Sequence, residues 1–150
     1  MRAIIQRVTE ASVTIDGKVT AQIGQGLLVL LGIEEADEQA DIDYLVRKIV
    51  PMRIFSDSKG KMNLSVQDIG GEILVISQFT LFASTKKGNR PGFTRAARPE
   101  IAIPLYEKFL YDLGQLCGRE IKAGIFGADM KIALINDGPV TIICDSRHLE

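Results

Sequence analysis

Leu27-Leu28-Val29-Leu30-Leu31-Gly32-Ile33 is a continuous apolar segment of the chain, interrupted only by its glycine. A second such segment, Ile73-Leu74-Val75-Ile76-Ser77, is short, rich in β-branched residues and followed by Gln78. Short apolar runs of this kind are typical of strands that are covered on both faces of a sheet. We therefore expect these two segments to form the buried centre of the fold.

Further strands are expected on both sides of these two segments. Asp16-Gly17 separates two stretches of strand-forming residues and is a strong signal for a hairpin turn. Asn136-Asp137-Gly138-Pro139 is interpreted as a turn between two late strands, because its residue types favour turns. The remaining predicted strands are Ala3–Val8, Ala11–Ile15, Val19–Ile23, Met52–Phe55, Ile121–Phe126, Met130–Ile135 and Val140–Cys144.

Two segments have the spacing of amphipathic helices. Apolar residues follow the i, i+3, i+4, i+7 pattern from Ile42 to Ile49, which predicts a helix over about residues 38–49. The same pattern runs from Tyr106 to Leu113. We expect Gly114 to end this second helix and Pro104 to lie within its first turn, where proline is tolerated.

Length and composition agree with one globular domain. The chain has 150 residues, of which 46% are hydrophobic and 25% are charged, the balance of an ordinary folded protein. No internal repeat or linker divides it. We expect an α+β fold in a single domain over residues 1–150, with two main helices and a mostly antiparallel sheet or a partly closed β-barrel.

The charge of the chain is unevenly distributed. The formal total is only −1, which by itself argues against a nucleic-acid partner. Residues 84–98, however, hold five Lys or Arg and no acid, so the rest of the chain carries −6. The composition of this segment is that of a loop. Its five cations, among them Lys86, Lys87 and Arg90, suit contacts to phosphate groups. The alternative is an ordinary solvated surface loop.

Several kinds of chemistry are made improbable by what the chain lacks. Its only histidine, His148, is two residues from the C-terminus, a poor position for a catalytic base or metal ligand because termini fray. Cys117 and Cys144 are too few for a disulfide framework or a metal cluster. No nucleotide-binding or metalloprotease motif is present. We expect no metal, no cofactor, no membrane span and a reducing, cytoplasmic location.

Polar residues follow the second apolar segment directly. In Ser77-Gln78-Phe79-Thr80, consecutive backbone N–H groups leave a strand and are not guaranteed a partner. Such groups can bind a developing oxyanion, with an effect of about 10²–10³ in rate for each donor in known cases. The alternative is a plain strand-to-turn junction in which the Ser and Thr side chains satisfy the local backbone.

Another candidate site surrounds a glycine turn near residue 127. Phe126 and Met130 bracket Gly127, and an aromatic ring with a thioether can hold a nucleobase between them. The alternative is that both side chains belong to the hydrophobic core.

These segments together resemble the bacterial D-aminoacyl-tRNA deacylases, also called D-tyrosyl-tRNA deacylases. The resemblance covers essentially the whole chain, and several motifs in the family's order are far more specific than any one of them. The matching blocks are residues 1–18, 48–55, 77–81, 86–91, 124–130 and 136–141.

The resemblance implies a homodimer that hydrolyses the ester between a D-amino acid and the 3′-terminal adenosine of tRNA, and that also removes glycine. It further implies that Gly138-Pro139 is a cis peptide inserted into the other subunit's pocket, where it would exclude L-amino acids by steric clash. Glycine has no side chain to clash and would pass the same filter.

The catalytic role is expected to fall on the backbone of Ser77, Gln78, Phe79 and Thr80, which would bind the ester carbonyl. A water oriented by the ribose 2′-OH would attack. Phe126 and Met130 would contact the terminal adenine, and the basic loop would track the acceptor-stem phosphates.

Other interpretations stay open on the sequence. Thr80 could act as a covalent nucleophile, although no neighbouring base is evident to activate it. The chain could be an RNA-binding module without catalytic activity, in which case residues 77–80 would not matter. It could also hydrolyse small esters, in which case the basic loop would not matter.

Overall fold

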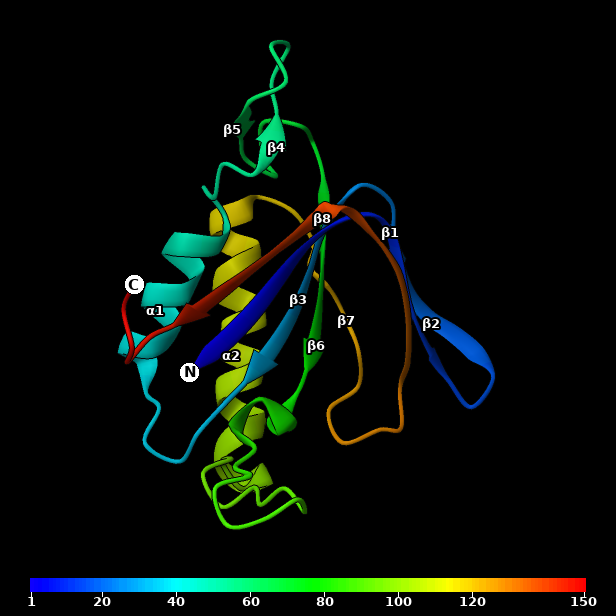
Figure 1. The fold of residues 1–150 in the computed structure, drawn as a ribbon. Coiled ribbons are helices and arrows are strands. Elements are labelled where there is room, and N and C mark those ends of the chain that lie inside the picture. Colours follow the sequence, from blue (N-terminus) through cyan, green and yellow to red (C-terminus); the bar gives the residue numbers. More distant parts are fainter.

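The computed structural model describes every residue from 1 to 150. Its main sheet has six strands, and the long first strand contacts three others (Figure 1). In chain order the strands are β1 (Arg2–Ile15), β2 (Lys18–Ile23), β3 (Gly26–Gly32), β6 (Glu72–Ser77), β7 (Lys122–Ala123) and β8 (Lys131–Asp145). A small separate hairpin is formed by β4 (Phe55–Ser56) and β5 (Met62–Leu64).

Strand β1 pairs antiparallel with β2, β3 and β8, whereas β3–β6 and β6–β7 are parallel. The sheet curls so that β2 approaches β6 and β7. The result is the expected α+β fold with a partly closed, barrel-like sheet. Strands β3 and β6 can be parallel because the connection between them is long enough to carry a helix, as a parallel crossover requires.

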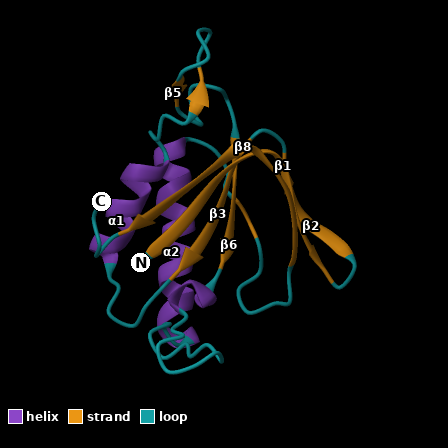
Figure 2. Ribbon diagram, in the orientation of Figure 1, coloured by secondary structure: helices purple, strands orange, loops and turns teal.

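The two helices, α1 (Gln39–Ile49) and α2 (Pro99–Cys117), lie together on one side of the sheet (Figure 2). Side chains of β3 and β6 alternate between two cores, as the pleat of a strand requires. Leu27, Val29 and Val75 face the helices in the larger core, whereas Leu28 and Leu74 lie in a smaller core on the opposite face. The prediction that both strands are covered on both faces is confirmed.

The first helix follows the sequence closely. The predicted residues Ile42, Leu45 and Ile49 are all buried, and the helix begins with a capping box between Glu38 and Asp41. The prediction for α2 is wrong at both ends. Gly114 lies inside the helix, which continues to Cys117 and ends at Gly118, a left-handed residue with φ of 71°. A left-handed glycine is a common helix C-terminus.

Pro104 lies inside α2 and not in its first turn. Proline removes one backbone hydrogen bond from a helix. Pro104 and Glu100, whose carbonyl loses that bond, both lie on the exposed side of the helix. Water can reach the carbonyl there, so the helix continues.

Strands β1 and β8 are each continuous where two strands were expected. The expected turn at Asn136–Pro139 is wrong, since these residues form a bulge within β8. Gln6 pairs with Thr141 and Val8 with Asn136, so β8 advances five residues while β1 advances two. Pairing with β1 on both sides of the bulge overrides the local preference for a turn.

Neither helix combines the length and the apolar content that crossing a bilayer demands.

The centre of the sheet supplies a stability test at Gly26. A Cβ built on Gly26 would lie 1.8 Å from the carbonyl oxygen of Glu72 on the paired strand. Gly26→Ala is expected to lower the free energy of unfolding by more than about 3 kcal/mol, because a backbone atom cannot move aside as a side chain can. Urea denaturation measures the change.

Gly24→Ala is the matched control, since a Cβ there would meet only the Glu72 carboxylate, at 3.8 Å. Equal stability of the two variants would contradict the close β3–β6 pairing.

Candidate active site

The chain turns sharply where β6 ends at Ser77. Gln78 N–H donates to the Leu31 carbonyl at 2.7 Å, and the 3₁₀ turn η1 (Phe79–Phe82) follows at once. The first bond of this turn is from Leu81 N–H to the Gln78 carbonyl, at 3.2 Å. The N–H groups of Phe79 and Thr80 therefore have no acceptor within the turn, as at the start of any helix.

A cavity of about 70 Å³ lies beside this turn. It brings Ser77, Gln78 and Phe79 together with Phe126, which is 48 residues away from Gln78 in the sequence. The other lining residues are Leu31, Ile33, Ala97, Ala102 and Gly127. The wall is mostly apolar with few polar groups, as in ligand pockets, but the volume is well below the roughly 300–1,000 Å³ of a pocket that encloses a whole ligand. The cavity can therefore receive a small group and not an entire nucleoside.

Gly32 makes the position of η1 possible. A Cβ on Gly32 would lie 3.0 Å from Leu81 Cβ, 3.1 Å from Phe82 Cε2 and 3.2 Å from the Gln78 carbonyl oxygen. These approaches are closer than ordinary packing distances. The glycine that interrupts the apolar segment is thus the point where the turn packs against β3.

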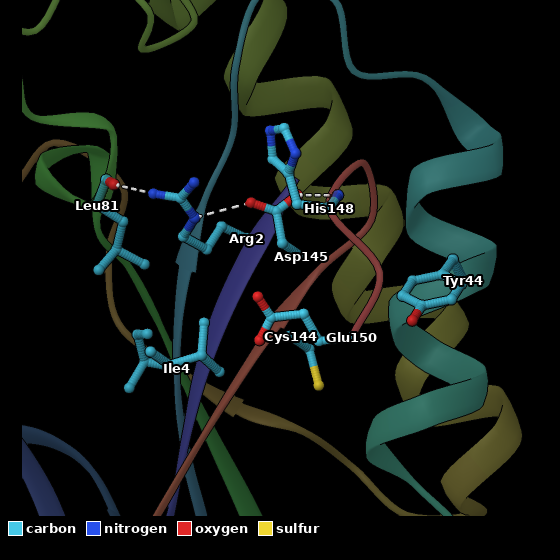
Figure 3. A pocket seen from close by; sticks show the side chains of 9 residues that line it. Arg2, Ile4, Tyr44, Leu81, Cys144, Asp145, His148 and Glu150 are labelled. Carbon is cyan, nitrogen blue, oxygen red and sulfur yellow. Dashed lines mark hydrogen bonds and ion pairs between the residues drawn. The ribbon is translucent and has the colours of Figure 1, made fainter.

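Arg2 holds the far side of the same turn. Its Nη1 donates to the Leu81 carbonyl at 2.8 Å and its Nε to Asp145 at 2.9 Å, as Figure 3 shows. Its guanidinium also lies 5.0 Å from the centre of the buried Phe82 ring, and Arg95 lies 5.3 Å from that ring. Cations at such distances are attracted to an aromatic ring. Arg2 and Arg95 therefore restrain η1.

The Asp145 carboxylate is suited to orient Arg2. Partial burial opposes its charged form, but the Arg147 N–H and the Arg2 guanidinium, among other donors, hold its pKa below the ordinary value. It is therefore charged at neutral pH.

A second pocket of about 410 Å³ adjoins this pair on the β1–β8 surface (Figure 3). It is lined by Arg2, Asp145 and His148 but by no residue of the cavity at Ser77. The only imidazole of the chain is thus outside that cavity.

The basic segment is a loop, as expected, and its five cations have two different environments. Arg95 pairs with Glu34 at 2.8 Å and Arg98 with Glu35 at 2.8 Å. Lys86, Lys87 and Arg90 form no ion pair and are exposed. The loop that carries these three is closed at its base by two hydrogen bonds between Ser84 and Gly92, of 2.8 and 2.9 Å.

The side chains of Phe126 and Met130 lie in different environments. The Phe126 ring lines the cavity and packs against Tyr106, with 5.8 Å between the ring centres. Burial raises the pKa of Tyr106 to about 12, and its hydroxyl donates to the Val75 carbonyl at 3.3 Å. The Met130 sulfur lies 2.4 Å from where a Cβ on Gly124 would be, and does not line the cavity.

Gly138-Pro139 is a cis peptide on the exposed bulge of β8. The preceding residue, Asp137, is held by Arg7, whose Nε donates to its carbonyl at 2.8 Å while Nη1 donates to the Ile54 carbonyl at 2.7 Å. The Arg7 side chain is only 12% exposed. The bulge is therefore fixed by a largely buried arginine.

The bulge is distant from Ser77 within one chain. It lies opposite Arg7, which pairs with Leu27, whereas Ser77 pairs with Leu31. Four residues of β3 correspond to about 13 Å, and three strand spacings of about 4.8 Å each separate β8 from β6. Figure 1 accordingly shows η1 at one end of the sheet and the middle of β8 at the other.

The chain was compared with known proteins. The family model described as D-Tyr-tRNA(Tyr) deacylase matches residues 4–145. The chain belongs to this family. It is 61% identical to the D-aminoacyl-tRNA deacylase of Flavobacterium johnsoniae and 60% identical to that of Bacteroides thetaiotaomicron, each over 150 residues and all of both chains. The family assignment made from the motifs is confirmed.

Solved structures share the fold of this chain. The chain superposes on a structure named "c-Myc DNA Unwinding Element Binding Protein" with a TM-score of 0.90 and 45% identity, covering 97% of this chain and 98% of that one. A probable eukaryotic D-amino acid tRNA deacylase has the same fold, with a TM-score of 0.82 at 16% identity, covering 95% and 97% of the two chains.

Three residues that the sequence did not single out support the turn at Ser77 and the bulge of β8. Arg2 and Arg7 lie in a strand that is otherwise mostly apolar, and such isolated cations are a usable signal for buried polar contacts. Gly32 was noted only as an interruption, although a glycine within a strand often marks a close backbone approach.

If the Arg2 contacts stabilise η1, replacing Arg2 should make this turn open more often. Arg2→Met keeps the apolar stem but leaves the Leu81 carbonyl without its side-chain donor and Asp145 with its backbone donors only. Amide hydrogen exchange at Leu81 and Ala83, whose N–H groups bond within the turn, is expected to become at least about fivefold faster, which corresponds to about 1 kcal/mol. Lys59→Met, on the exposed turn after β4, is the control. Unchanged protection in Arg2→Met would show that η1 is held without it.

Proposed function

We propose that the protein hydrolyses the ester bond of D-aminoacyl-tRNA in the cytoplasm and releases tRNA and the D-amino acid. The observation that carries the proposal is the cavity at the end of β6. It is lined by Phe79, which with Thr80 supplies the two unbonded N–H groups of η1, and Phe79 contacts Phe93 at the base of a loop with three unpaired cations. Hydrolysis of glycyl-tRNA belongs to the same proposal, because a pocket that selects by exclusion admits glycine.

The oxyanion would be bound by Phe79 and Thr80. Their N–H groups are the two that begin η1, whereas Gln78 N–H is already bonded to Leu31. Fixed donors of this kind stabilise a developing charge without having to reorganise. Ser77 and Gln78 would then form the wall of the site, with the donors supplied by the two residues that follow.

The attacking water would be oriented by the ribose 2′-OH of the substrate. The Thr80 hydroxyl accepts a hydrogen bond from the Gln78 amide, and no His, Asp, Glu or Lys lines the cavity. A nucleophilic threonine needs an adjacent base, so the substrate-assisted path is the better supported one. An aminoacyl ester is already activated toward hydrolysis, so the protein's side chains need to lower the activation barrier less.

The tRNA would be held at two places. Phe126 would contact the terminal adenine from the cavity wall, with Met130 as the more weakly supported second contact. Lys86, Lys87 and Arg90 would bind acceptor-stem phosphates, since their charges are not used within the chain.

The filter against L-amino acids would come from a second subunit. Gly138-Pro139 is exposed and too far from Ser77 to act within one chain. Strand β8 pairs only with β1, so its other edge is open. It also exposes Ile135 and Ile143, at 54% and 67%. An open edge with apolar side chains favours association, and a homodimer would bring one chain's bulge to the other's cavity.

The decisive assay compares D-Tyr-tRNA with L-Tyr-tRNA. We expect the D-substrate to be hydrolysed at least about 100-fold faster, the ratio that a steric cost of about 3 kcal/mol produces. Equal hydrolysis of both substrates, or of neither, would refute the proposal. Binding of tRNA without turnover would instead indicate the RNA-binding module, and turnover that is independent of Lys86 and Arg90 a small-ester hydrolase.

Thr80→Ala tests the role of the hydroxyl. If the backbone N–H is the donor, kcat/KM for D-Tyr-tRNA is expected to fall by less than about tenfold, because alanine keeps that N–H. Thr80→Ser is the control that keeps the hydroxyl. A loss to background in the alanine variant, with activity retained in the serine variant, would establish a covalent nucleophile.

Assembly is tested by light scattering combined with activity. We expect a mass of twice the 16.5 kDa of one chain, and specific activity that falls when dilution dissociates the dimer. Replacing the two exposed isoleucines by lysine, as Ile135→Lys with Ile143→Lys, is expected to give a folded monomer without deacylase activity. An active monomer would show that one chain holds the complete site.

A further inference from the structure

Two exposed aromatic rings lie in contact beside the cavity. The rings of Phe79 and Phe93 are 5.2 Å apart between centres, at an interplanar angle of 74°. Phe79 is 56% exposed and Phe93 37% exposed. Phenylalanine is normally buried, and an edge-to-face pair leaves ring surface open to a third planar group. The exposed faces of the pair therefore have the form of a binding surface for a planar group.

The pair connects the cavity with the basic loop. Phe79 lines the cavity, whereas Phe93 directly follows Gly92, which closes the base of the loop. Lys86, Lys87 and Arg90 all lie on the loop that Gly92 closes. A chain-like ligand leaving the cavity toward these cations would pass the two rings.

The backbone that carries Phe93 is fixed. The Phe93 carbonyl accepts a hydrogen bond from Ala96 N–H at 3.1 Å, and Ala97 N–H donates to the Ile33 carbonyl at 2.9 Å. Arg95 adds its ion pair with Glu34. Binding would therefore cost little ordering of the main chain.

We propose that Phe79 and Phe93 form a stacking site for an unpaired nucleobase of the RNA strand that leads to the scissile ester. This inference rests on the proposed function, since it takes the scissile ester of the terminal nucleoside to lie at the cavity. Bases of any identity can stack on an aromatic ring, with a contribution of about 1–3 kcal/mol for each base. The neighbouring cations would meet the phosphates of the same strand.

Charge favours RNA over a second copy of this chain as the occupant. The segment that surrounds Phe93 holds five cations and no acid. Three of these cations are not neutralised within the chain, so two such surfaces would repel each other. A strand with one negative charge per nucleotide is complementary to this surface.

The first experiment measures binding of the single-stranded oligonucleotide ACCA by fluorescence anisotropy. Phe93→Ala is expected to raise Kd by about 5- to 100-fold, and Phe93→Tyr, which keeps a ring, by less than about twofold. The salt dependence should not change in Phe93→Ala, because no phosphate contact is lost. Lys87→Ala should instead reduce the salt slope, by about 0.7 if it neutralises one phosphate.

Tyr111→Ala is the matched control, because Tyr111 is a 61% exposed aromatic residue on α2 that is outside the cavity. It should leave Kd unchanged. Should Phe93→Ala fail to fold, Phe93→Leu keeps the apolar volume without the ring and answers the same question. Equal binding by wild type, Phe93→Ala and Phe93→Leu would overturn the proposal.

The second experiment compares hydrolysis of D-Tyr-tRNA and of D-tyrosyl-adenosine, which lacks the preceding nucleotides. Phe93→Ala should raise KM for the tRNA with little change in kcat, and should leave kcat/KM for the nucleoside ester unchanged. Equal losses on both substrates would show that Phe93 only shapes the cavity. A change in oligomeric mass in Phe93→Ala would assign the rings to a second copy of the chain.

The stacking site and the proposed function can fail separately. Phe93-dependent binding of the oligonucleotide without hydrolysis of D-Tyr-tRNA would refute the deacylase proposal and leave the stacking site standing. Hydrolysis that is D-specific but independent of Phe93 would refute only the stacking site.

Discussion

The site depends on the missing side chain of Gly32. Strand β3 is apolar on both faces up to this residue, and a methyl group here would meet Leu81, Phe82 and the Gln78 carbonyl. Because the strand surface is bare at this point, the chain that leaves β6 can turn against it. The turn then places its first residue, Phe79, on the cavity wall, and Thr80 follows it along the chain. One close approach thus determines both where the turn lies and which cavity it adjoins.

The acidic residues that follow β3 also determine where the basic loop lies. Glu34 and Glu35 take up the charges of Arg95 and Arg98. These exposed pairs contribute little to stability in water, so their effect is mainly to restrict where the returning chain runs. The three cations left over are then carried by a loop with a fixed base. One strand and the residues after it therefore position both halves of the proposed tRNA site.

Local sequence signals predicted the parts of this protein that local physics determines. The apolar runs at 27–33 and 73–77 and the helix at 38–49 were predicted because burial patterns there agree with intrinsic preference. Asn136–Pro139 misled the prediction because pairing with β1 on both sides outweighs a turn tendency. The end of α2 was missed at Gly114, which is tolerated in a helix, although Gly118 a turn later is the residue with the left-handed backbone.

The residues of the candidate site likewise fall into those that local sequence signals identify and those that only the fold identifies. Ser77–Thr80 was recognisable because polar residues directly follow a buried strand. Arg2 and Arg7 stand out in the sequence as isolated cations in a strand, but their partners lie 47 to 143 positions away and could not be named from it. The exposure of Phe93 is revealed only by the fold. Spacing alone also paired Phe126 with Met130, whereas the turn between them directs one ring to the cavity and one sulfur to Gly124.

A filter that selects by exclusion needs rigidity more than affinity. The bulge that carries Gly138-Pro139 has it, because Arg7 is largely buried and spans from Asp137 to the Ile54 carbonyl. The proposed oxyanion donors would need rigidity as well, and the turn that carries them is restrained by Gly32, Arg2 and Arg95 at the other end of the sheet. Within one chain these two frameworks share almost no contacts, so each can be stiff without straining the other. In the proposed dimer they would meet only across the interface, where the substrate lies between two surfaces that were each rigid before it arrived.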